Sequence, residues 1–357
     1  MKAERKAALI VKNMKKIIKL VVLLFTIFML VPINVFANDE SSLFAYTSAN
    51  SEVENFAKEN VAIYMSSHYN NNVGDYELGK GITIFTQKNQ DKTLFPIWEN
   101  NRIIATFIVG YDSREFYAVY SEAYVDQLNY LSTVTSITSP MYIVTNNNGI
   151  YGVVGNKWYD LNRDAGIYEL KESYSVNDKK LVNSFEKINI VPYIQTRIPT
   201  SYAKSFNIYY IQTGSYCYSY ALGNLLRNMG YTNYTPADIQ NYMNYSSGAS
   251  KEDMSNYLKS KGLSCNYVNT GYLSFNDVMN IIYHNNSYIY IGAGSNTRDS
   301  RHAFVIYGYF NNGTTELYNF WNPWYNYKQT MSAGNRIIET ETSETFTWNN
   351  GYLYNIK

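Results

Sequence analysis

Residues 301–324 read RHAFVIYGYFNNGTTELYNFWNPW, and this stretch decides the fold of the second half of the chain. The apolar run Ala303 to Tyr309 predicts a buried strand, and Thr315 to Trp321 predicts a second one. The Asn-Asn-Gly sequence between them is a hairpin signal, because Asn and Gly tolerate positive φ. We therefore expect an antiparallel pair that places His302 at the end of one strand and Asn322 at the end of its partner.

Helical patterns come before this hairpin. Tyr218 to Met229 has apolar residues at helical spacing. Thr235-Pro236 and Ser250 to Leu258 open two further helices, the second with a capping box in which Asp253 stands in for the usual Glu. Further strands are expected after the hairpin. Helices followed by a sheet predict an α+β domain, here over residues 196–357.

The first half of the chain has a different pattern, that of a β-rich domain over residues 38–195. Alternating stretches such as Ile82 to Phe85 and Ile103 to Val109 predict strands. The Asn-rich sequence from Asn146 to Gly149 predicts a hairpin. From Leu170 to Ser201 the pattern loosens into a polar segment with two prolines, which predicts an exposed linker open to proteolysis. We place the domain boundary near residue 195.

The N-terminus has the order of a secretory signal peptide. A basic stretch is followed by the apolar run Leu20 to Val31 and by Val35-Phe36-Ala37, a small-residue cleavage signal. An uncleaved signal anchor is the alternative, but the apolar run is shorter than the ~20 residues that a bilayer requires. No later segment is apolar enough to span a membrane. We therefore expect removal of residues 1–37, secretion from the cell and no lasting membrane insertion.

The net charge and the number of cysteines argue against two classes of protein. Residues 1–37 hold seven basic side chains and one acidic one, so their removal changes the formal net charge from +1 to −5. Nucleic-acid binding is not expected, because it usually needs a basic stripe. The two cysteines, Cys217 and Cys265, are too few for a small domain held together by disulfides. One working thiol and one buried, incidental cysteine is the simpler interpretation.

Cys217 is a candidate nucleophile. It stands in the segment QTGSYCYSYA (212–221), where a loop turns into an amphipathic helix. The positive end of a helix dipole favours the thiolate, which is the nucleophilic form of cysteine. Gln212, on the same loop, could donate its side-chain amide to an oxyanion on a substrate carbonyl, beside the backbone N–H of Cys217. A buried structural cysteine at a helix start is the alternative.

His302 and Asn322 are the candidate partners of Cys217. The chain has three histidines, and His302 is the one at the end of an apolar strand, next to Asn322 on the partner strand. An amide carbonyl there would hold the imidazole in the tautomer that a general base needs. Trp321 and Trp324, which flank Asn322, could shield that hydrogen bond from water. The scattered histidines and cysteines have no metal-ligand spacing, so neither a metal nor another cofactor is expected.

At these residues the sequence resembles the staphopains, secreted papain-like cysteine proteases of Gram-positive bacteria. The resemblance rests on Gln212 with Cys217-Tyr-Ser-Tyr-Ala, on His302-Ala with its strand, and on Trp321-Asn322-Pro323-Trp324. It covers roughly residues 196–357, and the Trp-Asn-Pro-Trp sequence is its most specific part.

The resemblance implies a papain-like fold with two lobes, one helical and one an antiparallel β-barrel-like sheet, preceded by a β-rich propeptide domain. It also implies that Cys217, His302 and Asn322 form a catalytic triad and that Gln212 is the oxyanion donor. The chain departs from the family in two places. The spacing between Gln212 and Cys217 is one residue shorter than usual, and Arg301 takes the place of a common glycine.

The predicted function is that of a secreted cysteine endopeptidase made as a zymogen. It would hydrolyse peptide bonds through a thioester acyl-enzyme on Cys217, with His302 as general base and acid. The expected partners are protein or peptide substrates and the chain's own propeptide, an intramolecular inhibitor released by cleavage in the linker. The resemblance also allows a dedicated small protein inhibitor.

Two alternatives remain open at this point. The first is another Cys–His hydrolase or acyltransferase, such as a cell-wall amidase or a transglutaminase-like enzyme. The second is a non-catalytic secreted binding protein, which the 38 tyrosines of the chain would suit.

Overall fold

The structure, a computed structural model, describes most of the chain from residue 43 onward. The described residues are 43–69, 75–86, 92–111, 115–146, 149–162, 167–168, 180–183, 187–191, 200–244, 248–296, 299–340 and 344–357. The predicted signal peptide (1–37) lies outside them, as do the predicted domain boundary near residue 195 and most of the predicted linker (170–201). Among the described residues, no helix combines the length and the apolar character that crossing a bilayer requires.

The first half of the chain consists mainly of strands, as its alternating patterns predict. Its helices are α2 Ser51–His68 and α3 Val125–Val134. Its strands are β1 Phe44–Thr47, β2 Glu77–Leu78, β3 Ile82–Phe85, β4 Lys92–Glu99, β5 Arg102–Tyr111, β6 Phe116–Ser121, β7 Met141–Asn146, β8 Gly149–Val154, β9 Lys157–Asp160, β10 Ile167–Tyr168, β11 Lys180–Asn183 and β12 Ile188–Asn189. The predicted hairpin corresponds to the antiparallel pair β7 and β8.

The second half holds the remaining elements. Its helices are α4 Cys217–Asn228, α5 Pro236–Met243, α6 Lys251–Ser260, α7 Phe275–Met279 and the π-helical turn η1 Asn280–His284. Its strands are β13 Thr200–Ala203, β14 Asn266–Val268, β15 Ile289–Ser295, β16 Arg301–Asn311, β17 Glu316–Trp321, β18 Gln329–Ser332, β19 Arg336–Glu339 and β20 Glu344–Tyr354. The predicted capping box is present at α6, where Ser250 and Asp253 satisfy each other's backbone N–H groups. The predicted hairpin is the antiparallel pair β16 and β17.

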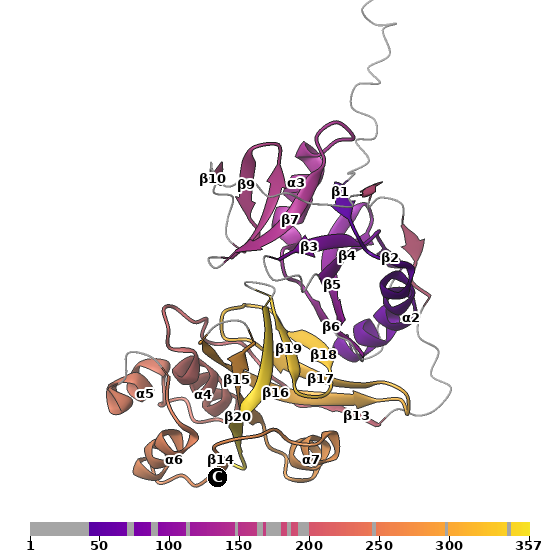
Figure 1. The fold of residues 1–357 in the computed structure, drawn as a ribbon. Coiled ribbons are helices and arrows are strands. Elements are labelled where there is room, and N and C mark those ends of the chain that lie inside the picture. Colours follow the sequence, from indigo (N-terminus) through magenta and orange to yellow (C-terminus); the bar gives the residue numbers. More distant parts are fainter. Residues whose placement is uncertain are drawn as a thin grey trace, which may run out of the picture. The chain divides into compact units, whose positions relative to one another are not determined.

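The strands of both halves belong to one hydrogen-bonded sheet. The described residues contain twenty strands, and most neighbours are antiparallel, although β7 runs parallel to β1 and to β3. The two halves meet where β6 pairs with β18, with Tyr120 opposite Thr330 (Figure 1). The fold is therefore a large mixed sheet with short helices against it. The α+β fold predicted from the sequence, a papain-like helical lobe and β-barrel-like lobe behind a β-rich propeptide domain, is wrong.

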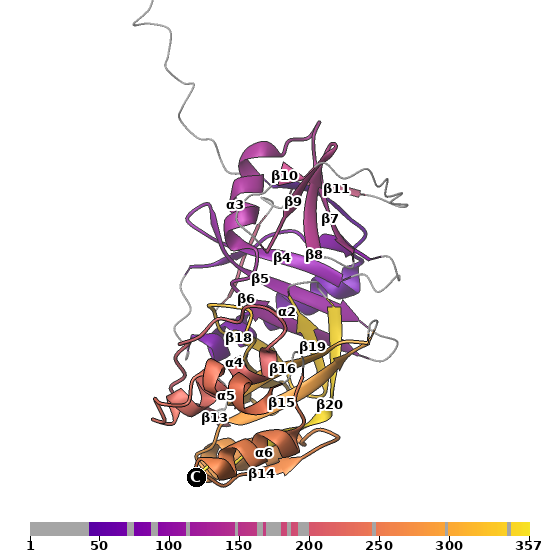
Figure 2. The ribbon, with the colours of Figure 1, turned by 90° about the vertical axis from the view of Figure 1, so that its left-hand side faces the viewer.

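In the second half, α4 packs its apolar face on the sheet, and α5 packs on α4 and α6. Leu222 and Leu225 of α4 are fully buried in one cluster with Val305 of β16 and Trp321 of β17. A short amphipathic helix with one apolar stripe needs a surface to cover, and here the sheet provides it. Figure 2 shows α4 in front of β15 and β16.

Side chains from both halves of the chain meet around α2. Leu317 of β17 is fully buried in a cluster with Tyr64 of α2 and apolar residues of β4, β5 and β6. The hydroxyls of Tyr64 and Ser332 are 2.6 Å apart, and Ser67 Oγ donates to Asn319 Oδ1 at 3.1 Å. The first half of the chain thus supports the strands that carry the β16–β17 hairpin.

We expect Leu317→Ala to lower the free energy of unfolding of the whole chain by about 2–5 kcal/mol, because the truncation leaves a cavity between the two halves. Urea unfolding followed by circular dichroism would measure the change. Leu181→Ala is the matched control, since Leu181 is 40% exposed and its truncation should change stability by no more than ~0.5 kcal/mol. Equal effects of the two substitutions would show that the two halves do not depend on this contact.

Candidate active site

Cys217 lies at the start of α4, after the loop that begins at Gln212. Gly214 has a φ of +66°, which glycine adopts without strain, and it lets this loop turn into the helix. The N-cap residue, Tyr216, makes no side-chain hydrogen bond to the first turn of α4. The backbone N–H groups of that turn therefore contribute their partial positive charge beside the thiol, which is buried.

His302 and Asn322 meet across the β16–β17 hairpin. His302 is the second residue of β16, and Asn322 follows the last residue of β17. The Nε2 atom of His302 is 2.7 Å from Oδ1 of Asn322, which also accepts the backbone N–H of Trp324 at 3.1 Å. Because a backbone N–H can only donate, the shared atom is the amide oxygen, and Nε2 of His302 must carry the proton. Nδ1 is then the ring nitrogen that is left for a second partner.

That second partner is the thiol of Cys217. The two side chains are hydrogen-bonded, although 85 residues separate them in the sequence. Burial acts to raise the pKa of Cys217, but the hydrogen bond and the charge of His302, with backbone hydrogen bonds from Ala303 and Tyr218, outweigh it. The pKa of Cys217 therefore lies below its usual value. Cys265 differs, because burial raises the pKa of its thiol and the side chain that hydrogen-bonds to it is Ser255.

We expect the alkylation rates of the two thiols to depend differently on pH. Only the thiolate reacts, so the rate rises as the pH passes the pKa of each thiol. The iodoacetamide reaction of Cys217 should reach half its maximum rate at lower pH than that of Cys265, measured by peptide mass spectrometry. His302→Ala should move the Cys217 profile to higher pH and leave that of Cys265 in place. Coincident profiles in the unsubstituted protein would contradict the assigned hydrogen bond.

Gln212 lies in the same pocket and is almost fully buried. Its backbone N–H donates to the carbonyl of Pro323 at 2.7 Å, which ties the loop before Cys217 to the segment after Asn322. Its side-chain Nε2 donates to the carbonyl of Gly214 at 2.7 Å. A primary amide has two N–H donors, so the hydrogen bond to Gly214 leaves the other for an oxygen of a bound molecule.

The two tryptophans that flank Asn322 lie in different places. The ring of Trp324 lies nearly parallel to the imidazole of His302, with 6.5 Å between the ring centroids and 14° between the planes. Trp321 is fully buried in the core, where its ring packs on Phe206 and its Nε1 donates to the carbonyl of Tyr325. Of the two predicted shielding residues, Trp324 is the one that the structure places against His302.

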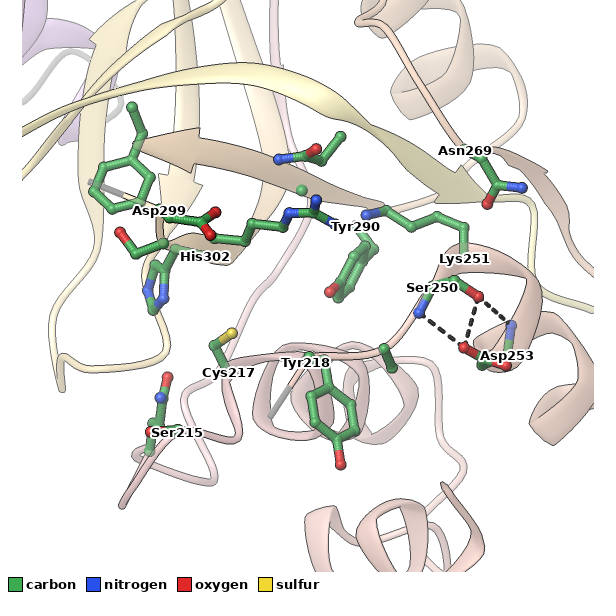
Figure 3. Close-up of a pocket in the computed structure, with 18 of the residues that line it drawn as sticks. Ser215, Cys217, Tyr218, Ser250, Lys251, Asp253, Asn269, Tyr290, Asp299 and His302 are labelled. Carbon is green, nitrogen blue, oxygen red and sulfur yellow. Dashed lines mark hydrogen bonds between the residues drawn. The ribbon is translucent and has the colours of Figure 1, made fainter. Parts of the chain in front are cut away.

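Cys217 and His302 open into a pocket of about 1070 Å³. Figure 3 shows the sulfur of Cys217 pointing into this space, with the ring of His302 beside it. All the described residues that line the pocket lie between residues 212 and 350. A smaller cavity of about 610 Å³, which Trp324 also lines, is lined by residues of both halves, among them Glu122 and Tyr124.

The pocket also contains charged side chains that the sequence did not identify. Lys251, the first residue of α6, lines it and is only 6% exposed. Arg301, next to His302 in the chain, lines it as well. Within the described residues, no group of three or more His, Cys, Asp or Glu side chains is placed to hold a metal ion.

Comparisons of the sequence with known proteins leave the family open. No protein-family model matches the chain. The search of curated proteins likewise gives no significant match.

Proposed function

We propose that the protein is a cysteine endopeptidase in which Cys217 is the nucleophile and His302 the general base and acid. The observation that carries the proposal is the chain of hydrogen bonds from Cys217 to His302 and from His302 to Asn322. A thiol with a lowered pKa, a histidine within hydrogen-bond reach and a third group that orients the histidine form the arrangement that activates a nucleophile.

The proposed reaction follows from these positions. The Cys217 thiolate attacks the carbonyl carbon of the scissile bond, and the backbone N–H of Cys217 and the free N–H of the Gln212 amide stabilise the oxyanion. The C–N bond then breaks as His302 gives the leaving amine the proton that its Nδ1 took from the Cys217 thiol, which leaves a thioester on Cys217. His302 next takes a proton from water, whose oxygen attacks the thioester and releases the acid and the thiolate. Asn322 keeps the imidazole in the tautomer described above.

Secretion, synthesis as a zymogen and kinship with the staphopains are part of the proposal. Residues 1–37 support secretion, and the sequence of the residues around Cys217, His302 and Asn322 supports the kinship. Segment 38–195 would act as the intramolecular inhibitor. Its support is that Glu122 and Tyr124 of this segment line a cavity together with Trp324, which also lines the pocket of Cys217.

Two substrates test the proposed activity. We expect the incubated full-length protein to cleave casein at internal bonds, giving new N-termini that sequencing can identify, and to release no fragments from peptidoglycan. Release of cell-wall fragments with intact casein would instead favour an amidase. Intact substrates in both assays, combined with slow and equal alkylation of the two cysteines, would favour a binding protein.

The zymogen part has its own test. Incubation of the purified full-length chain should produce a new N-terminus within residues 170–200, and casein hydrolysis should increase as the fragment before this cut is degraded or released. A chain that is stable, uncut and fully active would contradict a zymogen and would leave the peptidase proposal in place.

A further inference from the structure

Two positively charged side chains line the pocket of the candidate nucleophile, and among the described residues neither has an acidic partner. Lys251 and Arg301 both line the pocket that contains Cys217. In the described part of the chain, no carboxylate lies within salt-bridge distance of either side chain. The ammonium of Lys251 instead faces the ring of Tyr290, 5.5 Å from its centroid. Burying a cation such as Lys251 without a hydrogen-bonded counter-charge costs folding free energy. The presence of Lys251 at this position therefore calls for an explanation.

The strand beneath Lys251 is shaped to admit its ammonium. Gly292 of β15 lies under this side chain, and a Cβ atom at that position would collide with Nζ of Lys251. Gly292 pairs with Ala303, the residue after His302, so the ammonium lies against the part of the sheet that carries the imidazole. Figure 3 shows Lys251 extending from the start of α6 towards Tyr290, across the pocket from Cys217. The side chain is thus aimed into the pocket and not towards solvent.

The acidic residues of the pocket do not neutralise Lys251. Both carboxylate-bearing residues of the lining, Asp253 and Asp299, are more exposed than Lys251. The carboxylate of Asp253 accepts hydrogen bonds from the backbone N–H and the hydroxyl of Ser250. Burial lowers the pKa of Lys251 to about 8, the Cys217 thiolate acts to raise it and Arg301 acts to lower it. Lys251 is therefore mostly charged at neutral pH, and the charges that act on it are those of the site.

We propose that Lys251 and Arg301 form a binding site for a carboxylate of the substrate peptide, so that the enzyme prefers substrates with an acidic group close to the scissile bond. This inference rests on the proposed peptidase function. Arg301 is exposed and Lys251 is buried, so a carboxylate between them would supply the missing counter-charge beside the buried ammonium, where charge-assisted hydrogen bonds are strong. The carboxylate could belong to a Glu or Asp side chain or to the C-terminus of a short peptide.

Peptide cleavage tests the preference. A set of C-terminally amidated peptides would carry Glu, Gln or Leu at each position within two residues of the cleaved bond. We expect kcat/KM for the Glu peptide to exceed that for its Gln counterpart by about tenfold or more at one position. A preference that appears only when the amide is replaced by a free C-terminus would identify the terminal carboxylate as the ligand. Cleavage with no preference for either carboxylate would overturn the inference and leave the peptidase proposal standing.

Substitutions locate the preference. Lys251→Met keeps the length of the side chain and removes its charge, and Arg301→Gln removes the second charge. Each should reduce the Glu-to-Gln ratio by about tenfold. Lys259→Met is the matched control, because Lys259 lies on the exposed face of the same helix and does not line the pocket. A ratio that is unchanged in both pocket variants would overturn the inference.

Alkylation of Cys217 tests the same site without any peptidase activity. Iodoacetate carries a carboxylate and iodoacetamide does not, so the ratio of their rate constants cancels changes in thiol nucleophilicity. We expect this ratio to be about tenfold higher at Cys217 than at Cys265 in the unsubstituted protein. It should fall towards the Cys265 value in Lys251→Met, which leaves the charges of Arg301 and His302 in place.

The outcomes separate the two proposals. A high ratio at Cys217 in a protein that cleaves no peptide would support the carboxylate site and count against the peptidase. Equal ratios at the two cysteines of the unsubstituted protein would overturn the carboxylate site. Equal losses of both rates in Lys251→Met would also overturn it, because Lys251 would then act on the thiolate and not on the ligand.

Discussion

Replacing Cys217 by Ala is expected to lower kcat/KM for a casein-derived peptide by on the order of 10⁵-fold, because the reaction loses its nucleophile. The residual activity should fall to the background of the assay, because Cys217 is the one cysteine among the described residues that line the pocket. Fold should be retained, since Ala fits the space of the buried thiol and keeps the helix start. Continuous hydrolysis assays and a thermal melt would measure both effects.

Cys265→Ala is the control for this experiment. Cys265 lies outside the pocket, so its replacement should leave kcat/KM within about twofold of the unsubstituted value. His302→Ala should match the loss seen with Cys217→Ala, because residues that act as one unit give non-additive losses. Full activity of Cys217→Ala would end the proposal for this site, whatever the activity of the other variants.

Asn322→Ala is expected to lower kcat by about 10²-fold, since the imidazole is then free to rotate away from the thiol. Oδ1 of Asn322 holds Nε2–H of His302 at 2.7 Å, and the residue is fully buried, so water does not readily replace the amide. The effect of the substitution on KM should be small, because Asn322 does not line the pocket. Initial-rate kinetics over a range of substrate concentrations would separate kcat from KM.

Asn319→Ala provides a matched control for loss of an amide. Asn319 lies on β17, three residues before Asn322, and is also buried, but its Oδ1 accepts hydrogen bonds from Ser67 and Thr330 and none from His302. This variant should lose about 1–3 kcal/mol of stability and keep its kcat. The pH profile of Cys217 alkylation should change in Asn322→Ala alone. Similar kcat values for both variants would contradict a positioning role of Asn322.

The candidate site could be predicted from the sequence because its residues stand at the ends of strongly patterned elements. The apolar run after His302 predicts one strand, and the hairpin signal that follows predicts its antiparallel partner. Together they place Asn322 next to His302. The helix after Cys217 is equally plain, since its apolar residues recur at helical spacing. Such patterns predict where helices and strands begin and end. Here Cys217, His302 and Asn322 lie at those ends and come together in the site.

The fold could not be predicted in the same way, because its decisive pairing is between distant segments. Strand β18 reads Gln-Thr-Met-Ser, with no alternation of apolar and polar residues to mark it. Its Thr330 is nevertheless fully buried, where it donates to Asn319 at 3.0 Å and lies opposite Tyr120 of β6. A polar residue that is buried through long-range hydrogen bonds leaves no local signal, so the joining of the two halves was missed.

Lys251 was missed for a related reason. A lysine in the first turn of a helix is usually solvated, and the helix dipole disfavours it there. The residue that makes room for the ammonium is Gly292, forty-one residues later, because it has no side chain. Only the sheet brings these two positions together.

The pairing of β6 with β18 affects what a single cut in the segment between the two halves would accomplish. Three residue pairs of the sheet, the Tyr64–Ser332 hydroxyl contact and the 2.8 Å ion pair between Arg336 and Glu115 all cross from one half to the other. A nicked chain would therefore remain a non-covalent complex of two fragments that co-purify. Separation of the two fragments would remove β6 from β18. The exposed edge of β18 would then tend to pair with a strand of another molecule. Activation by proteolysis would thus need a second event that destroys or displaces the first fragment.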